Sequence, residues 1–319
     1  MTNNQQAMRP PAASPGLRIA TRPKAFSFRW VAKKMLSKRD REALLKLLDD
    51  PAPGVRKSLL AHFTALGDCG IQFLREVVSG LNREQAKHAT WYLAELKFGD
   101  PAAEFRGFIR SLNYELETGA LLLSRTVTPQ LDTGACGSAL DRMAARCREL
   151  ISEPATAREK CRIINRVLFH EWGFHGNVEQ YTDPLNSFLD QVILRRKGIP
   201  ISLSILYLLV AHRLDLELEP VGLPGHFVVG CYTGKEPFFV DPFDRGVFRD
   251  AEEVLDLLRS NNLTPNGTDL MPTPVREVLC RCCRNLVNHY GTAGNPERAK
   301  LFAGFVEEFE STHARESQP

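Results

Sequence analysis

Two residues fifteen positions apart, His226 and Asp241, are the pair in this chain best suited to do chemistry together. His226 lies in the run Pro-Gly-His-Phe-Val-Val, and Asp241 lies in the run Phe-Phe-Val-Asp-Pro-Phe. Each short hydrophobic run between turn residues predicts a β-strand. A carboxylate beside a histidine fixes the imidazole tautomer, which is the orienting half of a nucleophile–His–Asp site. We expect adjacent antiparallel strands joined by a loop at residues 233–236, with a side-chain hydrogen bond of about 2.7–3.2 Å.

Residue patterns along the chain predict the elements that hold this pair. Residues 1–30 begin with a segment rich in Asn, Gln, Ala and Pro, which predicts a disordered lead. Residues 31–110 are expected to be helical, either as stacked pairs of the HEAT kind or as a helical cap without a repeat. Residues 111–260 combine helical periodicity with strand-like runs and are expected to form the core. Residues 261–319 are expected to be a polar linker and a helical tail.

The composition is that of an ordinary globular protein. The 319 residues are 43% hydrophobic and 25% charged, with a net charge of +3, which allows a real core. This balance offers no basic stripe for a nucleic acid and no attraction to an anionic membrane. No apolar run approaches the roughly 20 residues of a transmembrane helix, and the N-terminus has no signal-peptide core. We therefore expect a cytoplasmic protein whose eight cysteines are reduced.

Three of the cysteines, Cys280, Cys282 and Cys283, lie close together. A Cys-x-Cys-Cys run could bind a soft metal, but this one falls in an expected helix. No Cys-x-x-Cys pair or nearby histidine completes a tetrahedral set. Buried thiols are the simpler interpretation, because cysteine packs as a small hydrophobic residue. We expect neither a metal nor an organic cofactor.

Five motifs follow one another in the second half of the chain. They are Gly-Phe-His-Gly-Asn at 173–177, Tyr-Thr-Asp-Pro-Leu-Asn-Ser at 181–187, Arg-Arg-Lys-Gly-Ile-Pro-Ile-Ser-Leu-Ser at 195–204, Pro-Gly-His-Phe at 224–227 and Asp-Pro-Phe at 241–243. In this order they closely resemble the bacterial SirB-one family, whose members have a transglutaminase-like (papain-like) core and a tetratricopeptide-like helical tail. The resemblance covers about residues 110–310. It implies an α+β fold with antiparallel strands and a tail that packs on the core.

The resemblance also implies that a nucleophile has been lost. Active transglutaminase-like cysteine enzymes open their core helix with a Gly-x-Cys stretch, where the helix N-terminus and an imidazole favour the thiolate. In this chain Gly-Ile-Pro at 198–200 stands in that place, so Pro200 occupies the thiol position. Proline suits the first turn of a helix but supplies no nucleophile. His226 and Asp241 match the family's His and Asp positions and form a remnant catalytic pair.

Other residues could in principle replace the thiol. Ser202 and Ser204 follow Pro200 in the same expected helix, which should run to about residue 213. Ser204 lies one turn along, about 6 Å deeper at 1.5 Å rise per residue. A bond from either hydroxyl to a nearby backbone carbonyl is the simpler interpretation. Cys161 and Cys231 lie outside the motif.

Four residues are candidates for lining a groove beside the His–Asp pair: Asn177, Asp183, Arg196 and Ser204. For Asn177 and Asp183 the alternative is a local role in turns. Arg196 could neutralise Asp183 or Asp241, or could meet an acidic ligand. Sequence alone leaves these alternatives open.

Taken together, the lost thiol and the flanking helical units favour a non-catalytic protein with a protein or peptide partner and an interaction or regulatory role. The alternative is a hydrolase or acyl transferase that uses His226 and Asp241 with an unorthodox nucleophile or with water. A nucleic-acid role is not expected, because no basic stripe with interleaved aromatic residues is present.

Overall fold

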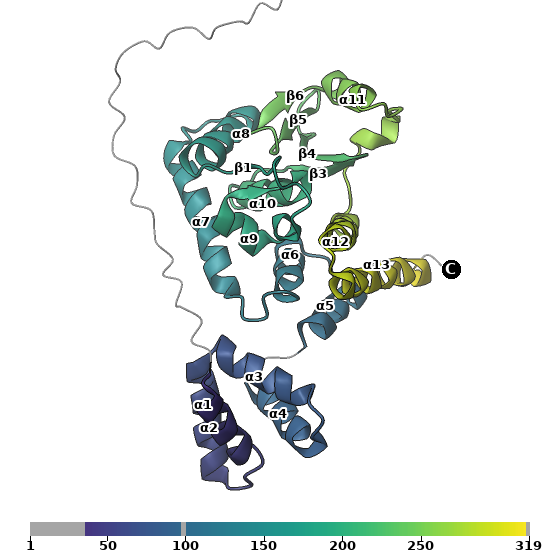
Figure 1. The fold of residues 1–319 in the computed structure, drawn as a ribbon. Helices are drawn as coiled ribbons and strands as arrows, with labels where there is room; N and C mark the ends of the chain where they lie inside the picture. Colours follow the sequence, from purple (N-terminus) through teal and green to yellow (C-terminus); the bar gives the residue numbers. More distant parts are fainter. Residues whose placement is uncertain (1–35, 97–99, 317–319) are drawn as a thin grey trace, which may run out of the picture.

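The computed structural model describes residues 36–96 and 100–316. In this part of the chain helices surround a small antiparallel sheet, as expected of an α+β protein (Figure 1). The sheet and most of the helices form a larger body, and four N-terminal helices form a smaller one. The predicted disordered lead over residues 1–30 lies outside the described residues.

The smaller body consists of amphipathic helices: α1 (Lys38–Leu47), α2 (Pro53–Leu66), α3 (Asp68–Val78) and α4 (Arg83–Glu95). Side-chain oxygens of Ser37 and Asn82 cap the free N–H groups at the starts of α1 and α4. Phe63, Phe73 and Tyr92 fill a hydrophobic cluster that is distinct from the larger core. The helical prediction for this region is confirmed, whereas its likeness to HEAT repeats stays a prediction.

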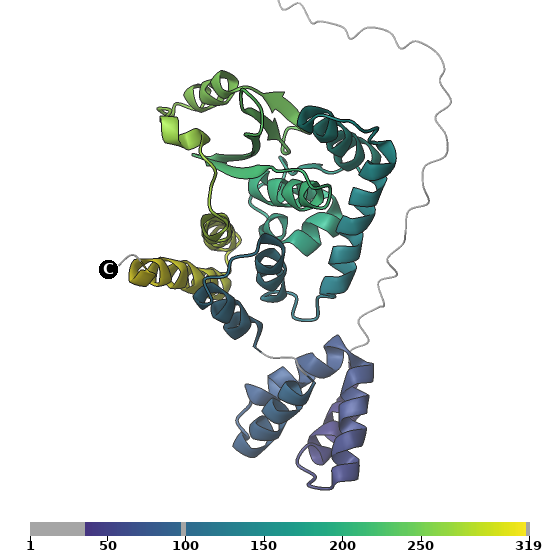
Figure 2. The same ribbon diagram turned by 180° about the vertical axis from the view of Figure 1, so that it is seen from behind.

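One buried helix organises the larger body. This helix is α10 (Pro200–His212). The other helices and helical turns of the larger body before the tail are α5 (Pro101–Arg110), α6 (Leu116–Arg125), α7 (Thr133–Leu150), α8 (Ala157–Asn165), the π-helical turn η1 (Arg166–Glu171), the 3₁₀ turn η2 (Pro184–Ser187), α9 (Leu189–Arg195) and α11 (Ala251–Ser260). Residues 200–211 of α10 are all buried, and a helix that is apolar on every side must be surrounded by protein. It packs between β4 and helices α6, α7 and α9 (Figure 2). No helix of the described part of the chain is both long and apolar enough to cross a membrane.

The sheet has four strands in chain order: β3 (Glu219–Leu223), β4 (His226–Cys231), β5 (Phe238–Asp241) and β6 (Val247–Arg249). All three neighbouring pairs are antiparallel. The loop from β4 to β5 contains the predicted residues 233–236. Two very short strands, β1 (His175–Gly176) and β2 (Lys197–Gly198), pair in parallel and hold the segment before α10.

The tail is a helical hairpin of α12 (Val275–Thr292) and α13 (Pro296–Glu316), preceded by the 3₁₀ turn η3 (Gly267–Leu270). Phe302, Phe305 and Phe309 of α13 are fully buried, and the Phe305 ring meets Phe105 edge-on at 4.9 Å. The expectation that the tail packs on the core is confirmed.

Two predicted boundaries need correction. The helical unit was expected to reach residue 110, but Phe105 and Ile109 of α5 are buried in the larger core, so α5 belongs with the core. Residues 261–274 were expected to be a linker, but Thr273 hydrogen-bonds to β3 at Pro220 and Gly222. In both cases the pattern indicated the local structure but not the surface on which the segment packs.

The tightness of the tail–core contact can be tested at Gly119 in α6. A Cβ added there would lie 2.4 Å from Leu279 Cδ1 of α12 and 3.0 Å from Phe108 Cζ. Gly119→Ala should therefore lower the free energy of unfolding by about 1–3 kcal/mol, the cost of overpacking a core. Gly107→Ala in α5 is the matched control, because its Cβ would meet nothing within 4 Å. Gly107→Ala should raise the free energy of unfolding by about 0.5–1 kcal/mol. If the urea denaturation curves of both variants shifted in the same direction, the tight packing at Gly119 would be contradicted.

Candidate functional site

His226 is placed by the tight turn between β3 and β4. Leu223 pairs with His226 across the turn, so only Pro224 and Gly225 connect the two strands. Gly225 has a φ of +72°, a left-handed conformation that glycine adopts without steric cost. His226 is therefore the first residue of β4, and its side chain is 19% exposed.

Asp241 ends β5 and is almost completely buried. Its Oδ1 accepts hydrogen bonds from the backbone N–H groups of Phe243 (3.1 Å) and Asp244 (3.2 Å), which form a turn after the strand. Its Oδ2 lies 2.8 Å from His226 Nε2 and 3.6 Å from Arg249 Nε. The expected hydrogen bond between adjacent antiparallel strands is therefore confirmed.

The bond to Asp241 sets the tautomer of His226. A carboxylate only accepts hydrogen bonds, so Nε2 carries the hydrogen and Nδ1 presents a lone pair. No group in residues 36–96 or 100–316 forms a hydrogen bond with Nδ1. An imidazole held in this way can accept a hydrogen bond or a proton from a bound group or from water.

Pro200 occupies the first position of α10, and Arg213 caps the other end, which confirms the expected helix. Pro200 is buried. The start of the helix is fixed by Ser202, whose Oγ donates to the backbone oxygen of Asn186 (2.6 Å) and accepts from the N–H of Ile199 (3.1 Å). As expected, this hydroxyl is bound to backbone groups.

Ser204 lies one turn further along α10 and is fully buried. Its Oγ is 3.5 Å from the backbone oxygen of Phe227, the residue after His226. The hydroxyl thus lies between α10 and β4, as expected of a backbone partner. The prediction that Ser204 lines a groove is wrong, because a side chain without exposed surface cannot meet a ligand in an open groove.

Asn177 has a structural role in the loop over residues 177–187. Its Nδ2 donates to Asn186 Oδ1 (2.9 Å), and its Oδ1 accepts from the N–H of Gln180 (3.3 Å). Asn186 in turn donates to the backbone oxygen of Gln180 (2.7 Å). Both asparagines are buried. Of the two alternatives for Asn177, the geometry favours the local one over groove lining.

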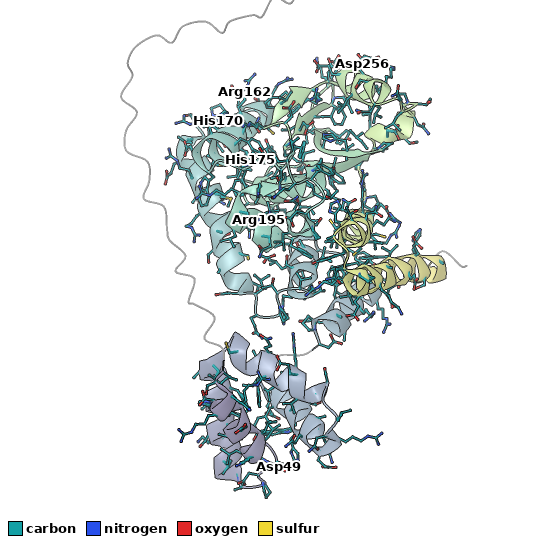
Figure 3. The ribbon with its side chains drawn as sticks, in the orientation of Figure 1. Asp49, Arg162, His170, His175, Arg195 and Asp256 are labelled. Carbon is teal, nitrogen blue, oxygen red and sulfur yellow. The ribbon has the colours of Figure 1, made fainter. Side chains whose placement is uncertain are left out.

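Asp183 also acts locally, at the start of η2. Its Oδ1 accepts from the N–H of Leu185 (3.0 Å), and its Oδ2 pairs with Arg195, which Figure 3 labels. Of the alternatives left open for Arg196, the pairing with Asp183 is therefore made by its neighbour Arg195 instead. Arg196 has a φ of +57° at the end of α9, and its guanidinium lies over the Trp172 ring, 5.8 Å from the centroid. Because of this left-handed conformation, the side chain of Arg196 points toward Trp172 while that of Arg195 points toward Asp183.

Several residues at the site were missed from the sequence. Arg249 is the cation beside Asp241, where Arg196 had been considered. The Phe243 ring meets the His226 ring edge-on at 6.1 Å, and Tyr181 packs on Phe243 at 6.0 Å.

One sequence signal for this aromatic contact existed, namely Gly176 in the first motif. A Cβ there would lie 2.6 Å from Phe243 Cε2, so a glycine is needed where the ring presses on the backbone. The sequence shows the glycine but not the ring that requires it.

Three of the buried cysteines are poorly suited to act as thiolates. Burial raises the pKa of Cys161 to about 12, of Cys280 to about 11 and of Cys282 to about 12. Thiols with such pKa values are protonated at neutral pH and are poor nucleophiles. Their burial fits the expected packing role, and the described residues contain no group of three His, Cys, Asp or Glu side chains that could hold a metal ion.

Comparisons with known proteins point to one family. The family model described as transglutaminase-like superfamily matches residues 135–284. A UPF0162 protein of Xylella fastidiosa is 35% identical over 190 residues, which are 58% of this chain and 68% of that protein. A UPF0162 protein of Vibrio cholerae is 32% identical over 131 residues, which are 41% of this chain and 48% of that protein.

A shorter similarity reaches a eukaryotic protein. F-box only protein 21 of Mus musculus is 47% identical over 81 residues, which are 25% of this chain but only 13% of that protein. No solved structure is significantly similar to the chain.

The role of Asp241 in setting the tautomer can be tested with Asp241→Asn. The amide oxygen can still accept from Phe243 and Asp244, but the amide nitrogen would then face His226 Nε2 and donate to it. We expect ¹⁵N NMR to show the hydrogen on Nδ1 of His226 instead of Nε2, and stability to fall by about 1–3 kcal/mol. Asp244→Asn is the control, because this exposed carboxylate pairs with Arg249 and, among the described residues, forms no bond with His226. An unchanged tautomer in Asp241→Asn would contradict the assignment.

Proposed function

Because this chain belongs to the UPF0162 protein family and carries a transglutaminase-like domain, we propose that it is a non-catalytic member of that superfamily. In this proposal it acts in the cytoplasm by binding a protein or peptide partner at the face around His226. The finer assignment to the SirB-one family, with a tetratricopeptide-like tail, is part of the proposal. So is the placement of the Pro200 ring opposite the His226 imidazole.

One observation carries the proposal: a proline begins the helix at which the resemblance places a catalytic thiol. The neighbouring hydroxyls do not replace it, since Ser202 and Ser204 are both buried against backbone oxygens. Histidine and aspartate without a nucleophile can orient a ligand or water. They cannot form the thioester on which transglutaminase-like catalysis depends.

The surroundings of His226 support binding over a purely structural role. A histidine that only joined two strands would need no open nitrogen, yet Nδ1 has no partner in the described part of the chain. On the other side of the Phe243 ring lies Tyr181. Tyr181 is 41% exposed, in a loop that also exposes Val178 (74%) and Leu185 (40%). Exposed apolar side chains gathered near a polar group are typical of protein-binding surfaces.

A hydrolase or acyl transferase remains the second candidate. The observation that favours it is the same free Nδ1, because Asp241 holds the imidazole as a general base would be held. Water would then have to be the nucleophile. His226-dependent turnover of an acyl or peptide substrate by the unmodified protein would establish this candidate over the first.

The loss of the nucleophile can be tested by restoring it. In Pro200→Cys the new thiol would lie at the N-terminus of α10 and, in our proposal, opposite His226. Both neighbours favour the thiolate, so the pKa of this thiol should fall below the ordinary value of about 8.5. We expect rapid alkylation by iodoacetamide near pH 7. The rate should drop in the Pro200→Cys, His226→Ala double variant, with the unsubstituted protein as the background control. A slow rate that is indifferent to His226 would refute the placement of Pro200.

The binding role can be tested by substitution at the exposed loop. Tyr181→Ala should reduce recovery of a partner co-purified from the source organism by about tenfold, the effect expected of an aromatic anchor. His226→Ala should reduce it as well. Leu81→Ala is the control, because Leu81 is fully exposed between α3 and α4, in the other body. A partner retained equally by all three variants would place the binding surface elsewhere.

A further inference from the structure

We infer that Arg281, in the tail helix α12, is a positioning residue for His226. Its Nη2 donates to the backbone oxygen of Leu223 (2.5 Å) and to that of His226 (2.8 Å). These two residues face each other across the Pro224–Gly225 turn. One guanidinium nitrogen thus ties together both ends of the turn that carries the histidine.

The environment of Arg281 holds the guanidinium in one place. It lies over the Phe227 ring, 5.6 Å from the centroid, and the side chain is half-buried. An arginine stays charged in proteins, and bonds from a charged donor to carbonyl oxygens are stronger than neutral ones. Arg281 is therefore a fixed cationic anchor for the backbone of His226, with the imidazole left free to bond Asp241.

A second contact from the tail reinforces the first. The N–H of Thr273 donates to the Pro220 oxygen (2.7 Å), and the N–H of Gly222 donates to Thr273 Oγ1 (2.8 Å). A Cβ on Gly222 would lie only 3.0 Å from Arg281 Nη1 and 3.1 Å from Thr273 Oγ1. The strand next to His226 thus has a glycine where both tail residues approach it.

These contacts make the tail part of the His226 site. Through Arg281, the position of α12 determines how the β3–β4 turn presents the imidazole to Asp241. A molecule that displaced α12 would therefore change the site without touching it. This regulatory reading rests on the proposed function, because it matters only if the His226 face is the working one. The positioning itself can be measured without any partner.

The test uses the full chain and reads the His226 ring by NMR, with the signals assigned from a His226→Gln spectrum. In the unsubstituted protein the Nε2 hydrogen is bonded to a buried carboxylate and should exchange slowly with water. In Arg281→Met we expect this exchange to become at least about tenfold faster, because the turn is released. Arg281→Lys should recover part of the slow exchange, since an ammonium group can reach one carbonyl.

Arg284→Met is the matched control on the same helix. Arg284 pairs with Glu277 and Glu310 of the tail and not with the sheet, so its loss should leave His226 exchange unchanged. If Arg281→Met does not fold, Gly222→Ala provides the same test from the other side by crowding the guanidinium, and should also speed exchange.

If the Nε2 hydrogen of His226 still exchanged slowly in a folded Arg281→Met variant, the inference would be overturned. The same result in Gly222→Ala would overturn it where Arg281→Met does not fold. Exchange that accelerates as much in Arg284→Met would do the same, because the effect would then be general loosening of the tail. Catalytic turnover by the unmodified protein would end the proposed function but not this inference, since the ring is read without substrate.

Discussion

A carboxylate removed from water must be surrounded by hydrogen-bond donors, and Asp241 imposes this requirement on the whole site. Its donors come from the turn after β5 and from His226 at the start of β4, and the Arg249 guanidinium on β6 adds an ion pair at 3.6 Å. They meet only while the three strands keep their antiparallel register. The place and tautomer of the histidine are thus consequences of satisfying one buried charge.

The sheet that carries this charge is small, so its position depends on the helices around it. On one face α10 lies against β4, with Ser204 facing the Phe227 carbonyl. At the β3 edge, Thr273 and Arg281 bond the strand and its turn. Segments up to 77 positions apart in the chain, from Ser204 to Arg281, therefore hold one histidine, which explains why the tail packs as part of the domain.

The same arrangement bears on the choice between catalysis and binding. The site keeps the parts that orient an imidazole, while Pro200 supplies no nucleophile and the hydroxyls of Ser202 and Ser204 lie against backbone oxygens. Orientation without a nucleophile is useful for recognition, because a fixed acceptor nitrogen beside exposed aromatic surface costs little entropy on binding.

The sequence by itself determined whatever depends on neighbouring residues. Turn residues and hydrophobic runs predicted the strands of His226 and Asp241, and Pro200 predicted the start of α10. Both predictions held because turn chemistry and proline geometry act locally. Only the tertiary structure decided which arginine meets which carboxylate, since the left-handed φ of Arg196 turns it from Asp183 and leaves that role to Arg195. The assignment of α5 to the larger core and the reach of Arg281 to the His226 turn were likewise hidden. Helical periodicity shows that one face of a helix is apolar. The segment that covers this face lies far away in the sequence, and no local pattern identifies which segment it is.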